Sequence, residues 1–134
     1  MKRIYSLALL ACASAQAEIS VMDISGVKVT LAAPARRIVS LAPHITELAF
    51  AAGAGDRLVG NVEHGSYPPA AKTIPSVGGY SRLDLEAIVA LKPDLVLAWE
   101  SGNAPADVAK LRSLGLAVYL SQPNRIIDVA APIS

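Results

Sequence analysis

The chain has 134 residues, of which 53% are hydrophobic and 17% are charged. This length suits one domain with its own hydrophobic core and is too short for two ordinary domains. The formal net charge is only +1, and two of the twelve basic residues lie at the extreme N-terminus. No strong basic surface therefore remains, and we expect no binding to nucleic acid.

Residues 1–17 contain the three parts of a secretory signal in the usual order. Lys2 and Arg3 form a positive region, residues 4–13 form a short apolar stretch, and Ala15-Gln16-Ala17 is a small-residue cleavage site. The apolar stretch is too short for a permanent membrane anchor. An ordinary N-terminal helix is the alternative, but it would not require these three parts together. We therefore predict a signal peptide and a periplasmic location.

The only cysteine, Cys12, lies inside this segment. Cleavage after Ala17 would leave a mature chain without a thiol, and hence without a disulfide. Leu9-Leu10-Ala11-Cys12 also resembles a weak lipoprotein signal, in which lipid would be attached to Cys12. Lipid anchoring is therefore kept as the alternative processing.

Short hydrophobic runs separated by turn residues predict alternating strands and helices after the signal. Weak alternation over residues 19–31 predicts a β-hairpin. A β-branched run at 36–41 predicts a buried strand. Thr46 is expected to cap a helix over 47–52, which ends at Gly53.

The next unit repeats this order. Residues 58–62 predict a strand, residues 64–69 a loop and residues 74–80 an extended segment. Asp84 is expected to begin a helix, because the apolar residues after it follow helical spacing.

The last part of the chain gives the clearest strand. Residues 95–99 are apolar throughout, which suits a parallel strand buried on both faces. A helix over 104–114, a strand over 116–120 and a further helix from Ile126 follow. Strands that alternate with helices through short connections predict an α/β fold, with a parallel β-sheet flanked by helices.

In such a sheet, ligands bind beyond the carboxyl ends of the strands. The loops at these ends carry His44, His64 and Trp99, which are both histidines and the only tryptophan of the chain. A tryptophan in this position suits a ligand cleft as well as local packing. The two histidines could meet as metal ligands, but no carboxylate is predicted between them, so we expect no metal site. We find no catalytic or phosphate-binding motif.

Several motifs between residues 35 and 128 resemble periplasmic binding proteins for cobalamin, haem and ferric siderophores. These motifs are Arg37-Ile-Val-Ser-Leu-Ala-Pro43, Thr46-Glu-Leu48, Ala51-Ala-Gly53, Leu58-Val-Gly60, Tyr67-Pro-Pro69, the stretch 84–99 and Ser101-Gly-Asn103. The stretch 84–99 and the tail after it are most similar to the cobalamin-binding branch. The resemblance implies a Rossmann-like lobe over residues 18–134, the first of two lobes joined by a long helix. The second lobe is absent from this sequence, so we expect a fragment or a truncated gene product.

The resemblance implies that five residues bind the ligand: Pro43, His44, His64, Tyr80 and Trp99. Trp99 would pack on the corrinoid ring. Tyr80 stands where cobalamin binders often have a tryptophan, and it also resembles the tyrosine that ligates iron in haem-binding relatives. Haem or a ferric siderophore is therefore the alternative ligand.

Glu86 resembles the glutamate that docks against arginines of the membrane permease. On its own, a glutamate in the first turn of a helix needs no role beyond favourable interaction with the helix dipole. The resemblance implies a monomeric substrate-binding component of an ABC importer that delivers cobalamin, without cofactor, metal or catalysis. A hydrolase or transferase on a similar sheet is the rival class, but it would need a nucleophile beside a base, and no such pair is visible.

Overall fold

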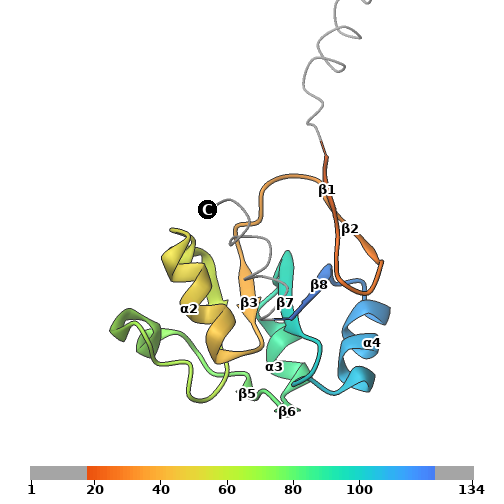
Figure 1. Ribbon diagram of the computed structural model, residues 1–134. Helices are drawn as coiled ribbons and strands as arrows, with labels where there is room; N and C mark the ends of the chain where they lie inside the picture. The colour runs from red at the N-terminus through yellow and green to blue at the C-terminus, as the bar shows by residue number, and fades with distance from the viewer. Residues whose placement is uncertain (1–17, 123–134) are drawn as a thin grey trace, which may run out of the picture.

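The computed structural model describes residues 18–122, and its centre is a parallel sheet of four strands in the order β4-β3-β7-β8 (Figure 1). The strands are β3 (Ile38–Ser40), β4 (Leu58–Gly60), β7 (Leu95–Trp99) and β8 (Val118–Ser121). This architecture confirms the predicted α/β fold with a parallel sheet. β3 and β7 are its two central strands, so their side chains are covered on both faces.

Helices connect the strands and cover both faces of the sheet. They are α2 (Pro43–Ala51), α3 (Leu85–Ala90) and α4 (Pro105–Ser113), with short 3-10 helices η1 (Gly55–Arg57) and η2 (Pro69–Thr73). Figure 1 shows the strands between α2 and α4. Within residues 18–122, no helix has the length and apolar character needed to cross a bilayer.

The hydrophobic core has two parts, one on each face of the sheet. On the first face, Val39 and Val96 pack in one cluster with Ile88 of α3 and Leu111 of α4. The second cluster contains the neighbouring strand residues and the inner side of α2: Ala35, Ile38, Ala49 and Leu58, with Phe50, Leu95 and Leu97 against them. Because side chains alternate along a strand, adjacent residues of β3 and β7 enter different clusters. The sheet is therefore held rigidly from both sides.

A small hairpin of β1 (Ile19–Met22) and β2 (Lys28–Leu31) confirms the hairpin predicted over residues 19–31. A second small hairpin joins β5 (Gly78–Gly79) to β6 (Arg82–Leu83). The extended segment predicted over residues 74–80 is confirmed in part, since it holds β5 and one isolated bridge from Ser76 to Asn61.

Asp23 fixes the first hairpin to the sheet. One carboxylate oxygen accepts hydrogen bonds from the Ser25 N–H, the Ser25 hydroxyl and the Val27 N–H, at 2.9, 2.7 and 3.0 Å. The other accepts from Arg112 Nη2 at 2.7 Å and from the Leu120 N–H at 3.2 Å. The Asp23 side chain is fully buried. The hairpin is thus tied to both α4 and β8.

Of the two helix caps predicted from the sequence, one is confirmed and one is wrong. The Asp84 carboxylate caps α3 by accepting from the Ala87 N–H at 3.0 Å, as predicted. The predicted cap at Thr46 is wrong, because α2 already begins at Pro43, a residue whose fixed φ suits a first helical position. Thr46 is buried, and its hydroxyl donates to Asn61 Oδ1 at 2.5 Å. The signal peptide over 1–17 and the helix expected from Ile126 lie outside the described residues.

Candidate functional site

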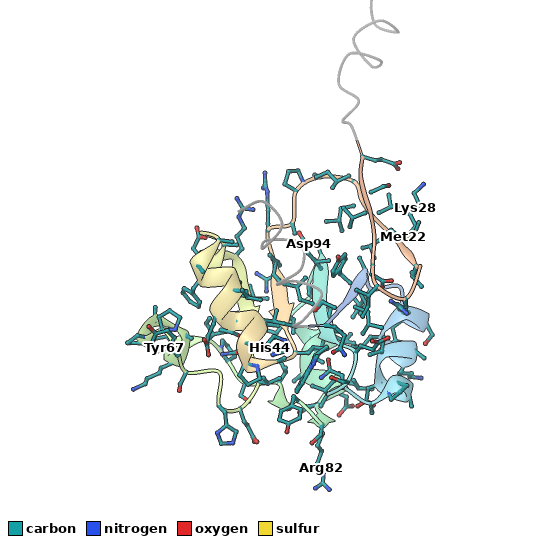
Figure 2. The ribbon with its side chains drawn as sticks, viewed as in Figure 1. Met22, Lys28, His44, Tyr67, Arg82 and Asp94 are labelled. Carbon is teal, nitrogen blue, oxygen red and sulfur yellow. The ribbon has the colours of Figure 1, made fainter. Side chains whose placement is uncertain are left out.

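Three of the predicted ligand-binding residues meet at the carboxyl end of the sheet. His44 lies in the first turn of α2, directly after β3, and Trp99 is the last residue of the adjacent strand β7. Their ring centroids are 5.0 Å apart with an interplanar angle of 82°, an edge-to-face contact. Tyr80, in the turn between β5 and β6, lies 5.2 Å from Trp99 at 53°. Figure 2 shows His44 at the lower end of α2. The arrangement is an aromatic cluster of His44, Tyr80 and Trp99.

Asn103 connects the three backbone segments around this aromatic cluster. Its Oδ1 accepts from the Trp99 N–H at 2.6 Å, and its Nδ2 donates to the carbonyls of Leu41 and Tyr80 at 3.0 and 2.7 Å. Only 4% of Asn103 is exposed. Both ends of its amide are therefore satisfied, and the segments bearing His44, Tyr80 and Trp99 are held together.

Gly102 makes room for the Trp99 ring. A Cβ atom at this position would overlap the six-membered ring of Trp99. The backbone of the turn after β7 therefore lies directly against the indole. Sequence reasoning used Ser101-Gly102-Asn103 only to support a family resemblance and did not include it in the site. Gly102 and Asn103, a small residue and a short amide directly after a buried strand, could have indicated this part of the site.

Two ring nitrogens in the aromatic cluster are buried without a hydrogen-bond partner among residues 18–122: His44 Nε2 and Trp99 Nε1. Burial lowers the pKa of His44, and the nearby carboxylate of Glu47 counteracts this only in part. Burial of His44 therefore favours the neutral form of its imidazole. The cluster offers a mainly apolar, uncharged aromatic surface at the place where ligands bind to parallel sheets.

The remaining predicted ligand residues, Pro43 and His64, lie outside this aromatic cluster. Pro43 precedes His44 and is half-buried. His64 is exposed in the loop after β4, with a left-handed backbone at φ 68°, and it is not among the rings in contact with Trp99. Buried Asn61 shapes that loop by donating to the Gly65 carbonyl and accepting from the Val62 N–H at 2.8 Å. Across residues 18–122, no group of three potential metal-ligating side chains is present.

Glu86 is exposed in the first turn of α3, at the rim of a shallow apolar hollow between α3 and α4. The hollow has a volume of about 350 Å³ and is lined by Leu85, Glu86, Val89, Ala90, Lys110 and Leu114. Val89 and Leu114 are 41% and 49% exposed. The predicted docking residue therefore lies on the outer surface, beside exposed apolar side chains.

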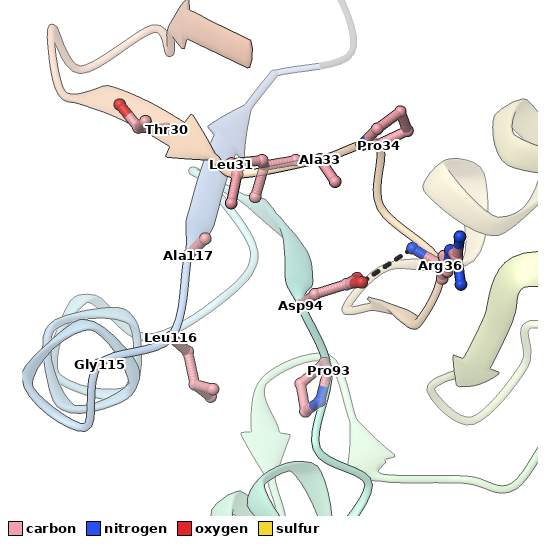
Figure 3. Close-up of a pocket in the computed structure, with 11 residues that line it drawn as sticks. Thr30, Leu31, Ala33, Pro34, Arg36, Pro93, Asp94, Gly115, Leu116 and Ala117 are labelled. Atoms are coloured by element: carbon pink, nitrogen blue, oxygen red, sulfur yellow. Dashed lines mark hydrogen bonds between the residues drawn. The ribbon is translucent and has the colours of Figure 1, made fainter. Parts of the chain in front are cut away.

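Another hollow, of about 410 Å³, opens at the opposite end of the strands (Figure 3). Its wall includes Asp94, whose carboxylate accepts from the N–H groups of Arg36 and Arg37 at 2.9 and 3.0 Å. These bonds tie the segment before β3 to the start of β7. Asp94 thus has a structural role at the end of the sheet away from the aromatic cluster.

Comparison with curated proteins gives close relatives. The chain is 48% identical over 97 residues to the vitamin B12-binding protein of Vibrio cholerae serotype O1, a match that covers 72% of this chain and 35% of the relative. It is 41% identical over 99 residues to the vitamin B12-binding protein of Yersinia pestis, covering 74% and 35%. The matches thus span about a third of the length of these relatives.

Solved structures show the same fold. The periplasmic vitamin B12-binding protein BtuF of Vibrio cholerae superposes with a TM-score of 0.64 at 52% identity, covering 66% of this chain and 35% of that one. The periplasmic heme-binding protein RhuT from Roseiflexus sp. RS-1 gives 0.62 at 38% identity, covering 65% and 34%. The family model described as periplasmic binding protein matches residues 38–130. The chain therefore belongs to the periplasmic binding protein family.

Proposed function

We propose that this chain supplies one wall of a corrinoid-binding cleft and takes part in delivering cobalamin to the membrane permease of an ABC importer. The observation that carries the proposal is the aromatic cluster of His44, Tyr80 and Trp99 at the carboxyl edge of the sheet. A corrinoid presents a wide apolar face, which aromatic rings cover well. Relatives named for vitamin B12 binding, a curated protein at 48% identity and a solved structure at 52%, support this choice of ligand.

The proposed setting follows from the family and from the N-terminal segment. The protein would act in the periplasm, as a monomer that carries its ligand without changing it. Pro43, which precedes His44, and His64, in the loop after β4, would complete the ligand surface on this lobe. Small-molecule sites usually bury ~70–90% of their ligand, so a second wall is required for tight binding.

Haem is the second candidate ligand, and one observation favours it. Tyr80 is 39% exposed, and its ring lies against Trp99. A ligand can therefore reach the Tyr80 side chain. A tyrosinate can ligate haem iron. The structural relative RhuT is named for heme binding.

The ligand is tested by titrating a two-lobed protein that carries this lobe with cobalamin and with haem. We expect cobalamin to bind more tightly, and Trp99→Leu to weaken its binding strongly, because the largest apolar contact is lost. Tyr119→Phe, a change at an aromatic residue outside the aromatic cluster, is the control and should leave affinity unchanged. Preferential haem binding, with an absorbance band that Tyr80→Phe removes, would replace cobalamin by haem. A chemically altered ligand after incubation would contradict the carrier function.

Glu86 is proposed as the contact to the permease. It is exposed at the rim of the apolar hollow between α3 and α4, so a partner could bring an arginine to the carboxylate and an apolar side chain to Val89 and Leu114. A charge-assisted hydrogen bond would form there. Rim charges act mainly on association rate and its salt dependence.

Docking is tested with reconstituted permease at low and moderate salt. We expect Glu86→Ala to slow association, most clearly at low salt, with ligand affinity almost unchanged. Glu86→Arg should be worse, because it opposes like charges. Asp56→Arg makes the same change of charge at an exposed site on η1 and should have little effect. If a folded Glu86→Arg variant docks as well as the wild type, Glu86 does not contact the permease and interacts only with the helix dipole.

A further inference from the structure

The Trp99 ring is held in place by three neighbours. His44 meets it edge to face at 5.0 Å, Tyr80 lies at 5.2 Å, and the backbone of Gly102 lies against the indole. Of these three, only His44 has a ring that changes its charge near neutral pH. The orientation of the proposed ligand-binding tryptophan therefore depends on a titratable neighbour.

The His44 ring is suited to this contact only in its neutral form. A neutral imidazole carries one N–H, and its other nitrogen can remain unprotonated. His44 Nε2 is buried with no acceptor among residues 18–122, so the neutral tautomer with the proton on Nδ1 leaves no donor unsatisfied there. An imidazolium carries N–H groups on both nitrogens and would bury one donor without a partner. Protonation therefore favours a ring that has turned Nε2 toward water.

The charged and titratable side chains on the surrounding segments are few. They are Glu47 on α2, Glu63 and His64 on the loop after β4, Tyr80 and Arg82 in the β5–β6 hairpin, and Glu100 after β7. Glu47 favours the imidazolium, but burial of His44 outweighs it, so the pKa lies below the usual value. The unpartnered Nε2 and the burial of the ring thus both favour the neutral form of His44.

We propose that His44 is a positioning residue: its neutral ring holds Trp99 in the orientation that receives the ligand, and protonation releases Trp99. The role in ligand capture rests on the function proposed above, whereas the coupling between the two rings does not. A ligand should accordingly be held more tightly at neutral than at mildly acidic pH.

The coupling can be measured without ligand, because Trp99 is the only tryptophan of the chain. Its fluorescence is followed in the ligand-free chain between about pH 8 and about pH 5, across the range in which histidine titrates. We expect the emission to move to longer wavelength and acrylamide quenching to increase as the pH falls. His44→Gln should abolish this transition, since the amide cannot gain a proton. His64→Gln, the matched change at the exposed histidine, should leave it intact.

Far-UV circular dichroism over the same range checks that each variant remains folded. A pH-independent emission in the folded wild-type chain would overturn the proposal. A transition that persists in His44→Gln, or one that disappears in His64→Gln, would assign it to another group and also overturn it.

The link to the ligand is tested in a two-lobed protein by cobalamin titration at the same two pH values. We expect affinity to fall several-fold at the acidic pH in the wild type and much less in His44→Gln. Cobalamin that binds equally well at both pH values would overturn the role of His44 in capture. A fluorescence transition without any cobalamin binding would keep the ring coupling and contradict the proposed ligand instead.

Discussion

Asp23 and His44 both lie in short segments next to the central sheet, but they differ in whether their buried polar atoms have hydrogen-bond partners. The buried Asp23 carboxylate accepts hydrogen bonds from Ser25, Val27, Arg112 and Leu120. His44 keeps a buried ring nitrogen without any partner among the described residues. A buried polar group without a partner lowers stability, whereas a fully bonded one specifies a structure.

Two tasks are thus separated within one small lobe. The region around Asp23 fixes the first hairpin to α4 and β8 through a carboxylate whose two oxygens are both bonded, although Nε of its partner Arg112 is buried without a partner among the described residues. The aromatic cluster keeps aromatic surface and unbonded ring nitrogens at the ligand-binding edge of the sheet. Strained or incompletely satisfied groups tend to gather at functional sites, where the rest of the fold compensates for them.

The largest expected effect is from Asp23→Ala. This change leaves Arg112 without its ion-pair partner and removes the acceptor of several backbone N–H groups. We expect the free energy of unfolding to fall by about 3 kcal/mol, which chemical denaturation of the chain would measure. Asp56→Ala, at an exposed aspartate, should change it by no more than about 0.5 kcal/mol. If the two variants are equally stable, Asp23 does not fix the hairpin.

Asn103→Asp is expected to have the next largest effect. The Asn103 Nδ2 donates to two carbonyls, and a carboxylate would place an oxygen against them. We expect a loss of about 2 kcal/mol together with a change in Trp99 fluorescence. Asn103→Ala removes these two bonds and also the one from the Trp99 N–H, but it adds no charge and should be less harmful. A reversed order of the two variants would show that the amide donor is not what holds these segments.

Gly102→Ala tests the aromatic cluster more gently. The new Cβ would overlap the Trp99 ring, so the indole must move. Overpacking of this kind costs about 1–3 kcal/mol, and we expect the Trp99 emission to shift as well. Ser101→Ala, one residue earlier in the same turn, is the control. Unchanged emission in Gly102→Ala would mean that the backbone, not the ring, gives way.

The smallest effects concern acid. Burial of Asp23 opposes its ionisation, but hydrogen bonds from the Ser25 hydroxyl and from the N–H groups of Val27, Leu120 and Ser25 outweigh it and hold the pKa below its usual value. The stability that Asp23 adds is therefore complete above the unfolded-state pKa, ~3.9, and is lost as the pH falls through the lower folded-state value.

His44 also makes the protein less stable as the pH falls, but at higher pH values than Asp23. Its pKa is also lowered by burial, so the stability gained from the neutral ring is present above ~6.5 and is lost as the pH falls through its folded-state value. Denaturation midpoints measured across both windows should show two separate losses. His44→Gln should remove only the upper loss and Asp23→Ala only the lower one. One merged transition in both variants would contradict this separation.

The sequence predicted local features well. The uniform apolar run at residues 95–99 is β7, and Asp84 caps α3, because both depend on residues close in the chain. The meeting of His44 and Trp99 also follows from a local rule, since each lies at the carboxyl end of a parallel strand. The ligand-binding roles of Pro43, His44, His64, Tyr80 and Trp99 and the docking role of Glu86 stay predictions.

Long-range contacts account for what the sequence did not reveal. Threonine often caps helices, but the Thr46 hydroxyl instead donates to Asn61, which follows the next strand of the chain. Asn103 was missed as an organising residue because its amide bonds to the carbonyl of Leu41, which follows the neighbouring strand β3 and is distant in the chain. No spacing in the chain announces such bonds, which exist only after the strands have paired.

The parallel order of the sheet has a consequence for folding. Ile38 pairs with Leu58 and Val96 pairs with Val118, so β3–β4 and β7–β8 can each form within a short stretch of chain. The pair of β3 with β7, which joins Ile38 to Leu95, must close a much longer loop and gives the highest entropic cost. His44 and Trp99 stand on either side of that junction. The aromatic cluster is thus assembled by the least local strand pairing of the sheet, and a chain whose halves have formed separately has no binding surface to offer.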